Sequence, residues 1–374
     1  MKHIRITAAI LPFCLLMLTA CTMPDIGRMI YGPEETGESE PEQTETSAAA
    51  ESRSAEEINS IAEDILGQLR DYFSDGQESS GPVKRDTIGT ALRYEQTADG
   101  IEIKDYQPET EPAPDSNVLQ IPEIIDGQPV VAVGESGFSH SDYAHLIALP
   151  KTVTHFRDYA FHSSSVTSFM HDAEVIEMGD YCFKDCTKLE TILIPDSPFR
   201  IGEYCFDNSG AGDVTGTDCQ MKADDYCFTD MPKLKYVTLT GDVSLGEYCF
   251  QNCPVLSNVL FSDGTIEIGD YSFRQSALND LMIGKGSGGR IGDYCFMDCY
   301  RLDIVSIEEG ITEIGSYAFS NCHNLTHVSL PESLESIGSH AFSDCSSGLI
   351  FIVPAGSFAE QFCKENEYSY FAAN

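Results

Sequence analysis

Ile291-Gly292-Asp293-Tyr294-Cys295-Phe296 returns along this 374-residue chain in variants that all end on a phenylalanine. Successive phenylalanines are separated by 22 or 23 residues throughout. A period held this tightly is typical of stacked structural units, each of which contacts only its neighbours. The sequence therefore predicts a solenoid of about ten cycles, marked by Phe138, Phe161, Phe183, Phe206, Phe228, Phe250, Phe273, Phe296, Phe319 and Phe342.

Each cycle also contains an alternation of apolar and polar residues. Leu189-x-x-Ile192-x-Ile194 predicts a short strand with one buried face, and the same spacing recurs in the later cycles. Strands this short need neighbours, so we expect them to stack into a parallel sheet. The cycle after Phe206 is poor in apolar residues at these positions, which predicts a weak part of the sheet with a bulge or a mobile loop.

The residue three before each phenylalanine is acidic in most cycles, as at Asp293, but is Ser316 or Ser339 in the last two. Because Asp and Ser share the ability to cap a helix N-terminus, we predict a one-turn helix that begins at this residue in each cycle. A stacked ladder of carboxylates that binds a cation is the alternative. The glycine at the second hexapeptide position, Gly292, is predicted to occupy a tight turn in which a Cβ is costly.

The full pattern, Ile-Gly-x-Tyr-Ala/Cys-Phe-x-x-Cys-x-x-Leu-x-x-Val-x-Leu-Pro, resembles the BspA-like leucine-rich repeat family from Val133 to Pro354. The flanks 97–106 and 121–130 look like that family's N-terminal entry, and 353–362 like its C-terminal cap. The resemblance implies an α/β solenoid: a leucine-rich repeat stack with a parallel sheet on one face, one-turn helices or turns on the other, and a cap at both ends. It also implies a bacterial surface protein that binds macromolecules without catalysis.

The N-terminus has the features of an export signal. Lys2 and Arg5 precede an apolar run that is too short to span a bilayer, so residues 1–20 are predicted to be a signal peptide. The run ends Leu-Thr-Ala-Cys21, which resembles the bacterial lipobox and implies cleavage before Cys21 and lipidation of that residue. A plain signal peptide is the alternative. Lipidation predicts a protein anchored to the outer face of a bacterial membrane.

The rest of the chain divides by composition. Residues 21–54 are rich in Glu, Ser, Thr and Pro and predict a disordered acidic linker, and 55–75 predict an amphipathic helix that serves as a lid on the first repeat or as a partner helix. We expect cap strands in 81–132 with a hairpin at Asp99-Gly100, repeats in 133–354, and a C-terminal cap in 355–374. That cap is predicted to begin with a capping box, Ser357 to Glu360, and to place Phe358 and Phe362 against the last repeat.

The charge excludes some functions. With 60 acidic and 22 basic side chains the formal charge is −38, so a nucleic-acid partner is not expected. No nucleophile elbow, phosphate loop or zinc-protease motif occurs, so we expect no enzyme and no cofactor. Gly284 to Gly289 fits Gly-x-Gly-x-x-Gly, but no long helix follows, and it predicts a flexible loop. The expected partner is an unidentified macromolecule, most readily a protein. The protein is also expected to be attached to the membrane through lipid on Cys21.

Cysteines and histidines raise the question of metal sites. The 14 cysteines mostly follow the repeat, where Cys interchanges with Ala or Ser, which predicts small buried slots. Metal binding by pairs such as Cys182 and Cys186, and disulfides between stacked cysteines, are the alternatives. Solvated polar positions, with a zinc site as the alternative, are predicted for the histidines that cluster at His140, His145, His155, His162 and His171.

Binding is expected on the exposed face of the stacked strands, since side chains between the buried positions must point outward. Large apolar residues there suggest a contact surface, although scattered surface apolars are an alternative. There are two rival functions: a passive spacer of the envelope, and a carbohydrate-binding protein that uses the repeated tyrosines. If the tyrosines do not bind sugars, we expect them to pack successive units against one another. The predicted partner-binding residues are Leu193, Tyr236, Thr238, Asn258, Leu260, Met282, Ile304, Ser306 and His327.

Overall fold

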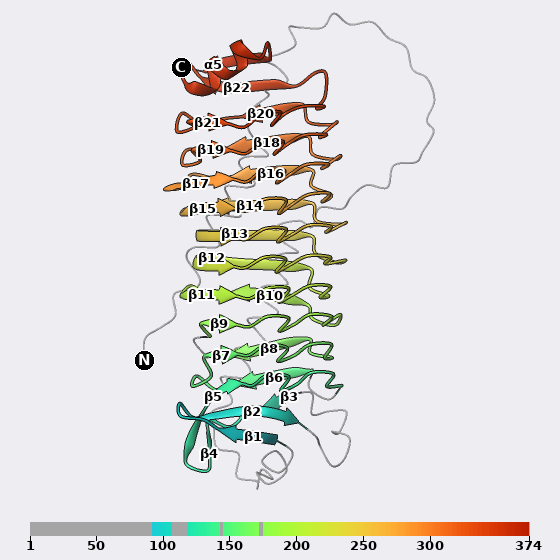
Figure 1. Ribbon diagram of the computed structural model, residues 1–374, viewed down its shortest axis with the longest axis vertical. Coiled ribbons are helices and arrows are strands. Elements are labelled where there is room, and N and C mark those ends of the chain that lie inside the picture. Colours follow the sequence, from blue (N-terminus) through green and yellow to red (C-terminus); the bar gives the residue numbers. More distant parts are fainter. Residues whose placement is uncertain (1–91, 107–117, 143–144, 172–174, 374) are drawn as a thin grey trace, which may run out of the picture. The chain divides into compact units, whose positions relative to one another are not determined.

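The repeat region forms a stack of coils along one axis, as predicted (Figure 1). The computed structural model describes residues 92–106, 118–142, 145–171 and 175–373. The predicted signal peptide, acidic linker and amphipathic helix lie outside the described residues. The ten phenylalanine rings stack in single file, with centroids 4.7 to 5.4 Å apart.

Most coils contribute two short strands, and these form two parallel series. The first series is the predicted one, except for its last strand. It consists of β3 (Val118–Gln120), β6 (Leu146–Leu149), β8 (Ser168–His171), β10 (Thr191–Ile194), β14 (Asn258–Ser262), β16 (Asp280–Ile283), β18 (Ile304–Ile307), β20 (His327–Ser329), β22 (Ile350–Pro354) and the unpredicted β23 (Ser369–Ala373).

The second series lies just before the hexapeptide and, apart from its first strand, which falls among the expected cap strands, was not predicted. It consists of β5 (Gln128–Val133), β7 (His155–Phe156), β9 (Glu177–Met178), β11 (Pro198–Ile201), β15 (Thr265–Ile268), β17 (Gly288–Ile291), β19 (Glu313–Ile314) and β21 (Ser336–Ile337). The signal was present, because Ile266 and Ile268 alternate with polar residues.

The coil after Phe206 corrects one prediction. Its strand, β12 (Asp213–Ala223), is continuous with both series, as is its neighbour β13 (Tyr236–Leu245). The expected bulge is present, as a register shift between Gly216 and Cys219, but a mobile loop is wrong. The strand persists because buried and outward positions still alternate, with small residues at some of the buried ones. Gly216 is one of these, and there is no room for a larger residue, since a Cβ on it would stand 2.8 Å from the Cβ of Ile194. The predicted Gly284 to Gly289 loop likewise ends in strand β17.

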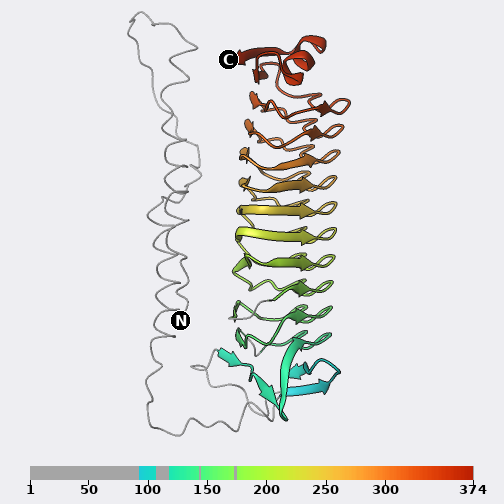
Figure 2. The ribbon, with the colours of Figure 1, turned by 90° about the vertical axis from the view of Figure 1, so that its left-hand side faces the viewer.

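The hexapeptide forms turns and not the predicted one-turn helix. Tyr159 has φ +58°, and every second N–H is used between coils: Tyr159, Phe161 and Ser163 donate to carbonyls of the next coil at 2.8 to 2.9 Å. The intervening N–H groups of Ala160 and His162 close turns within the coil. A helix would point these N–H groups along its own axis and away from the next coil, so the bonds between coils select turns. Figure 2 shows each coil as a strand that runs into a narrow loop at the same side of the stack.

The acidic column also has a different role from the predicted one. Asp158 Oδ1 accepts the backbone N–H of Asp180 at 3.0 Å, and Asp180 Oδ1 accepts that of Glu203 at 2.8 Å. The same bond joins Asp270 to Asp293 at 2.8 Å. These carboxylates therefore cap the neighbouring coil and not a helix of their own.

Both ends are capped. At the N-terminal end, β1 (Leu92–Gln96) and β2 (Ile101–Tyr106) form the hairpin predicted at Asp99-Gly100. A second hairpin joins β4 (Ile124–Ile125) to β5 through Asp126-Gly127, a turn signal that sequence reasoning overlooked.

At the C-terminal end, α5 (Phe358–Glu365) starts as predicted, because Ser357 Oγ accepts the N–H of Glu360. Phe362 packs on Phe342 and Phe351, whereas Phe358 is 38% exposed, so the prediction for Phe358 is wrong. Strand β23 then pairs with β22 in parallel.

Candidate functional site

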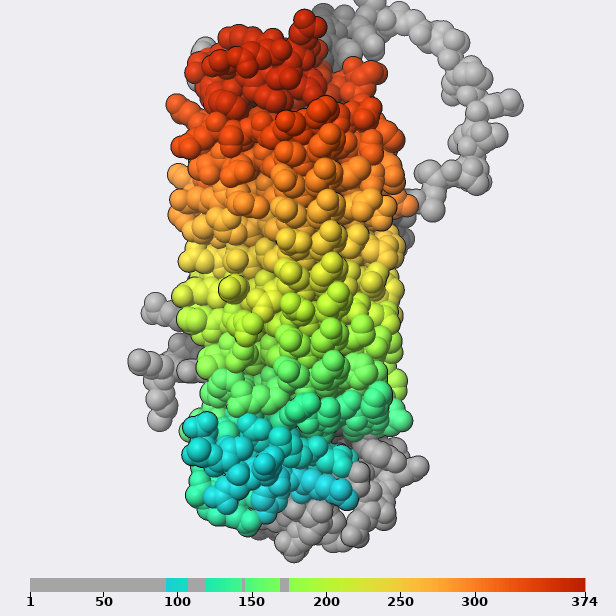
Figure 3. Space-filling model, in the orientation of Figure 1, coloured from blue at the N-terminus to red at the C-terminus, as the bar shows by residue number. Residues whose placement is uncertain are grey.

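The outward positions of the first strand series form two continuous columns, because the strands pair in register. Figure 3 shows one face of the stack, on which side chains of successive coils stand in lines along the axis. The Tyr236 column consists of Thr191, Asp213, Tyr236, Asn258, Asp280, Ile304, His327, Ile350 and Ser369. The Leu260 column consists of Leu193, Thr215, Thr238, Leu260, Met282, Ser306, Ser329, Ile352 and Phe371.

All nine predicted partner-binding residues lie in these two columns. Sequence reasoning missed the members contributed by β12, Asp213 and Thr215, because that coil was expected to be irregular. It also missed the columns' last members, Ser369 and Phe371, which lie in the unpredicted strand β23. Within the described residues, the first series is interrupted between β8 and β10, so both columns begin at β10.

Three apolar side chains are well exposed in the columns. Leu193 is 60% exposed, Ile304 46% and Phe371 59%. Tyr236, Thr238, Met282, Ser306 and His327 are half-buried, and Asn258 is exposed. Burial raises the pKa of the Asp280 carboxyl, and the neighbouring Asp303 carboxylate raises it further. The face thus joins apolar groups to a carboxyl group that holds a proton more readily than usual.

Leu260 departs from the prediction. It was expected to offer apolar surface, but it is only 6% exposed, although it points away from the core cluster. Its register partners Thr238 and Met282 stand one strand on either side and are themselves half-buried. Neighbours at a spacing of about 4.8 Å leave a leucine little open surface. Leu260 therefore offers little open surface and packs between its neighbours in the column.

The outward side of the second strand series is different in character. Glu177, Arg200 and Lys222 occupy one register column there. Arg200 pairs with Glu177 at 2.7 Å and with Asp224 at 2.6 Å. The charges of Glu177, Arg200 and Asp224 are thus paired with one another within the stack, although exposed pairs of this kind contribute little stability.

The tyrosines form a second stacked file. Neighbouring rings from Tyr159 to Tyr317 lie 4.7 to 5.2 Å apart with planes within 6° of parallel, and His340 continues the file. The predicted packing role is confirmed. Stacking of a sugar on a tyrosine needs an open ring face, and here each inner ring has both faces covered by its neighbours.

The repeat cysteines occupy buried slots, as predicted. All twelve described cysteines are free thiols, and all except Cys345 are buried. Cys186 Sγ donates to the Phe161 carbonyl at 2.9 Å, and Cys299 Sγ to the Phe273 carbonyl at 3.3 Å, so this slot serves the backbone of the previous coil. Burial raises the pKa of Cys186 to about 11 and of Cys299 to about 12, so both are protonated thiols at neutral pH.

The histidines do not converge on one point. His140 and His162 meet edge to face at 5.2 Å, and His162 lies 3.6 Å from Asp185. Burial and His140 lower the pKa of His162, and Asp185 opposes this. His155 lies in the second strand series, 3.8 Å from Glu177. In the part of the chain that the structure describes, no group of three or more His, Cys, Asp or Glu side chains is placed to hold a metal ion.

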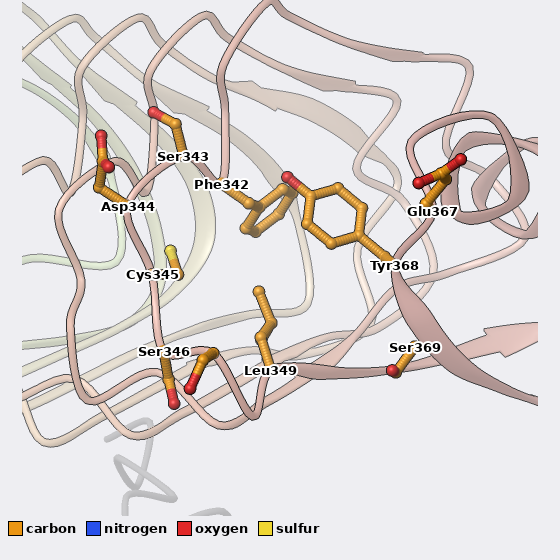
Figure 4. A pocket seen from close by; sticks show the side chains of 10 residues that line it. Phe342, Ser343, Asp344, Cys345, Ser346, Leu349, Glu367, Tyr368 and Ser369 are labelled. Atoms are coloured by element: carbon orange, nitrogen blue, oxygen red, sulfur yellow. The ribbon is translucent and has the colours of Figure 1, made fainter.

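A hollow of about 330 Å³ lies between the last repeat turn and the C-terminal cap (Figure 4). Ser343, Asp344 and Cys345 line it from the repeat, and Glu367 and Tyr368 from the cap. The Cys345 thiol is engaged with the Phe319 carbonyl at 3.2 Å, and burial raises its pKa to about 12, so it is a poor nucleophile there. No helix in the described ranges is both long and apolar enough to cross a membrane.

Comparison with known proteins identifies the repeat. The family described as the BspA type leucine rich repeat region matches residues 116–220 and 221–348, in six copies. No match was found among curated protein sequences.

Solved structures with similar chains come from bacteria. A leucine-rich repeat protein from Bacteroides ovatus shares 18% identity over 76% of this chain and 98% of its own, with a TM-score of 0.41. The pneumococcal vaccine antigen PcpA shares 16% over 76% and 97%, with a TM-score of 0.42. A leucine rich cell surface protein from Faecalibacterium prausnitzii shares 19% over 76% and 97%, with a TM-score of 0.31.

The family match spans well over half of the chain and coincides with the coils described above. The chain therefore belongs to the BspA-type leucine-rich repeat family.

Proposed function

We propose that this protein is a lipid-anchored bacterial surface protein that binds a macromolecule, most readily a protein, through the Tyr236 and Leu260 columns, and that it catalyses no reaction. The observation that carries the proposal is the contrast between the two strand series. The first presents Leu193, Ile304 and Phe371 to solvent, whereas the second presents mostly polar and charged side chains, of which Arg200 is paired with Glu177 and Asp224. Apolar anchors among polar groups are the usual make-up of a protein-binding patch.

The surface location rests on the family and on the N-terminal sequence. A matched structure from Faecalibacterium prausnitzii is described as a cell surface protein. In this chain, Leu18-Thr19-Ala20-Cys21 would place a lipidated cysteine at the start of the mature protein. The acidic stretch after it would keep the repeats away from an anionic membrane surface.

Replacing Leu193 and Ile304 together by Asp is expected to abolish partner capture. Each of the two anchors contributes about 2 kcal/mol or more, which is roughly a 30-fold loss of affinity per anchor. The intact protein is crosslinked on its own cells, the attached molecule is identified by mass spectrometry, and its affinity for purified wild type and variant is measured.

The matched control is Ile176→Asp, because Ile176 is 43% exposed and precedes the second strand series. It introduces one aspartate, as Ile304→Asp alone does, at an isoleucine that is about as exposed as Ile304 but lies outside the two columns. Equal binding by the wild type and the double variant would refute the proposed face. Absence of any specific attachment to the wild type would favour the passive spacer.

Anchoring has its own test. Cys21→Ser should move the protein from the membrane fraction to the soluble or secreted fraction, because each buried CH2 of the acyl chains contributes about 0.8 kcal/mol. Fractionation and labelling with a fatty-acid analogue measure the change. Cys14→Ser, within the same apolar run but outside the lipobox, is the control and should stay anchored. Membrane retention of Cys21→Ser would contradict lipidation.

A further inference from the structure

Strand β23 (Ser369–Ala373) ends the first strand series, and among the described strands it pairs only with β22. Ala355 N–H donates to Ala373 O at 2.9 Å, so Ala373 directs its backbone groups towards β22. Along a strand, successive residues direct their N–H and C=O groups to opposite edges. Tyr370 and Ala372 therefore direct theirs to the free edge, where no other part of the described chain bonds to them.

The side chains of β23 leave this edge open. All of them except Tyr370 are exposed, and Phe371 is 59% exposed. The strand contains no charged residue and no proline, which are the usual means of keeping a sheet edge from pairing. Strand β1 at the other end also pairs on one side only, but it carries Arg93 and Glu95. The C-terminal edge is thus the less protected of the two.

Charge and symmetry favour a second copy of the chain as the occupant of this edge. Each chain carries a formal charge of −38, so two copies repel each other wherever their acidic side chains would meet. Residues 368–374 are uncharged, so two copies that meet at this edge oppose no like charges along the strand. An antiparallel pair of identical edges is also complementary to itself about a two-fold axis.

We propose that two copies of this protein associate end to end through β23, in antiparallel register about a two-fold axis at Phe371. Tyr370 exchanges N–H to C=O hydrogen bonds with the partner subunit's Ala372, and Ala372 does so with the partner subunit's Tyr370. Every backbone group that faces the free edge within β23 is then satisfied.

The same register brings the two exposed phenylalanines together. Phe371 stands opposite the partner subunit's Phe371 at a non-hydrogen-bonded pair, where the side chains of antiparallel strands approach most closely. Because Phe371 belongs to the Leu260 column, that column continues from one stack into the other. The association does not depend on the function proposed above.

The test is sedimentation velocity on the full chain with Cys21→Ser, purified from the soluble fraction, so that no acyl chain holds copies together. One strand pair is a small interface, so we expect dimers with a dissociation constant of roughly 10–100 µM. Phe371→Lys should give monomers, because two lysines then stand opposite each other. Ser369→Lys is the matched control and should remain dimeric, because position 369 lies opposite Ala373 and not opposite itself.

Opposite charges test the axis itself. Phe371→Glu alone should also be monomeric, but a mixture of the Phe371→Lys and Phe371→Glu proteins should associate, because lysine then stands opposite glutamate. Circular dichroism checks that each variant keeps the fold. Dimers of Phe371→Lys alone, failure of the mixture to associate, or a wild type that is monomeric at about 0.1 mM would overturn the proposal. A monomeric wild type that loses its partner on cells when Phe371 is replaced would instead assign the edge to an extended segment of a different protein.

Discussion

Phe228→Ala is expected to lower the free energy of unfolding by about 3–5 kcal/mol, the range for removing a buried phenylalanine ring. Phe228 is 0% exposed, and its ring stacks on Phe206 at 5.3 Å and on Phe250 at 4.7 Å. Because each coil of a solenoid is stabilised mainly by its two neighbours, this one change weakens two interfaces in the middle of the stack. Urea unfolding followed by circular dichroism measures it.

Tyr226→Ala is the matched control in the same coil. Tyr226 also stacks between two rings, at 4.7 and 4.8 Å, but it is only half-buried. Its loss should cost about 1–3 kcal/mol, from two ring contacts worth roughly 0.5–1.5 kcal/mol each. If the two variants lose equal stability, the phenylalanine file is not the core that holds the coils together.

The architecture was predictable because one physical requirement repeats ten times. Every coil must bury a phenylalanine and an apolar strand face against the next, so the period and the first strand series follow from the positions of residues such as Phe183, Ile192 and Ile194. The predictions that were wrong concern the local backbone conformation within each coil. The left-handed backbone at Tyr159 and the turn it creates depend on hydrogen bonds to the next coil, which one repeat viewed alone does not contain.

The candidate face was predicted in the same uneven way. The alternation of apolar and polar residues correctly predicted that Leu193 and Ile304 point outward and are exposed, since a strand has only two faces. The prediction that Leu260 is exposed was wrong, because the accessible surface of a side chain also depends on its neighbours across the sheet, here Thr238 and Met282. Asp213 and Thr215 were missing from the predicted columns because a segment with few apolar residues does not look like a strand. The segment is nevertheless a strand, because it pairs in register with β10 and β13.

Gly202→Ala is expected to destabilise the stack by about 1–3 kcal/mol, the range for overpacking a tight site. Sequence reasoning attributed this column of glycines to a tight turn, but the backbone of Gly202 does not lie in the left-handed region. The reason is proximity to the coil below. A Cβ on Gly202 would stand 2.4 Å from Asp180 Oδ1 and 2.7 Å from Asp180 N, so it would displace the carboxylate that accepts Glu203 N–H.

Gly212→Ala separates this steric cause from the general effect of replacing glycine. Gly212 lies in the next coil and also avoids the left-handed region, but its added Cβ would meet nothing closer than 3.8 Å. Alanine there restricts the unfolded chain without a clash, which should be neutral or stabilise by about 0.4–1 kcal/mol. Opposite signs for the two variants in urea unfolding would establish that the contact between coils requires the glycine. Equal effects of the two substitutions would mean that the turn, and not the contact with Asp180, requires glycine at position 202. The Asp180 carboxylate would then not be the reason for the glycine.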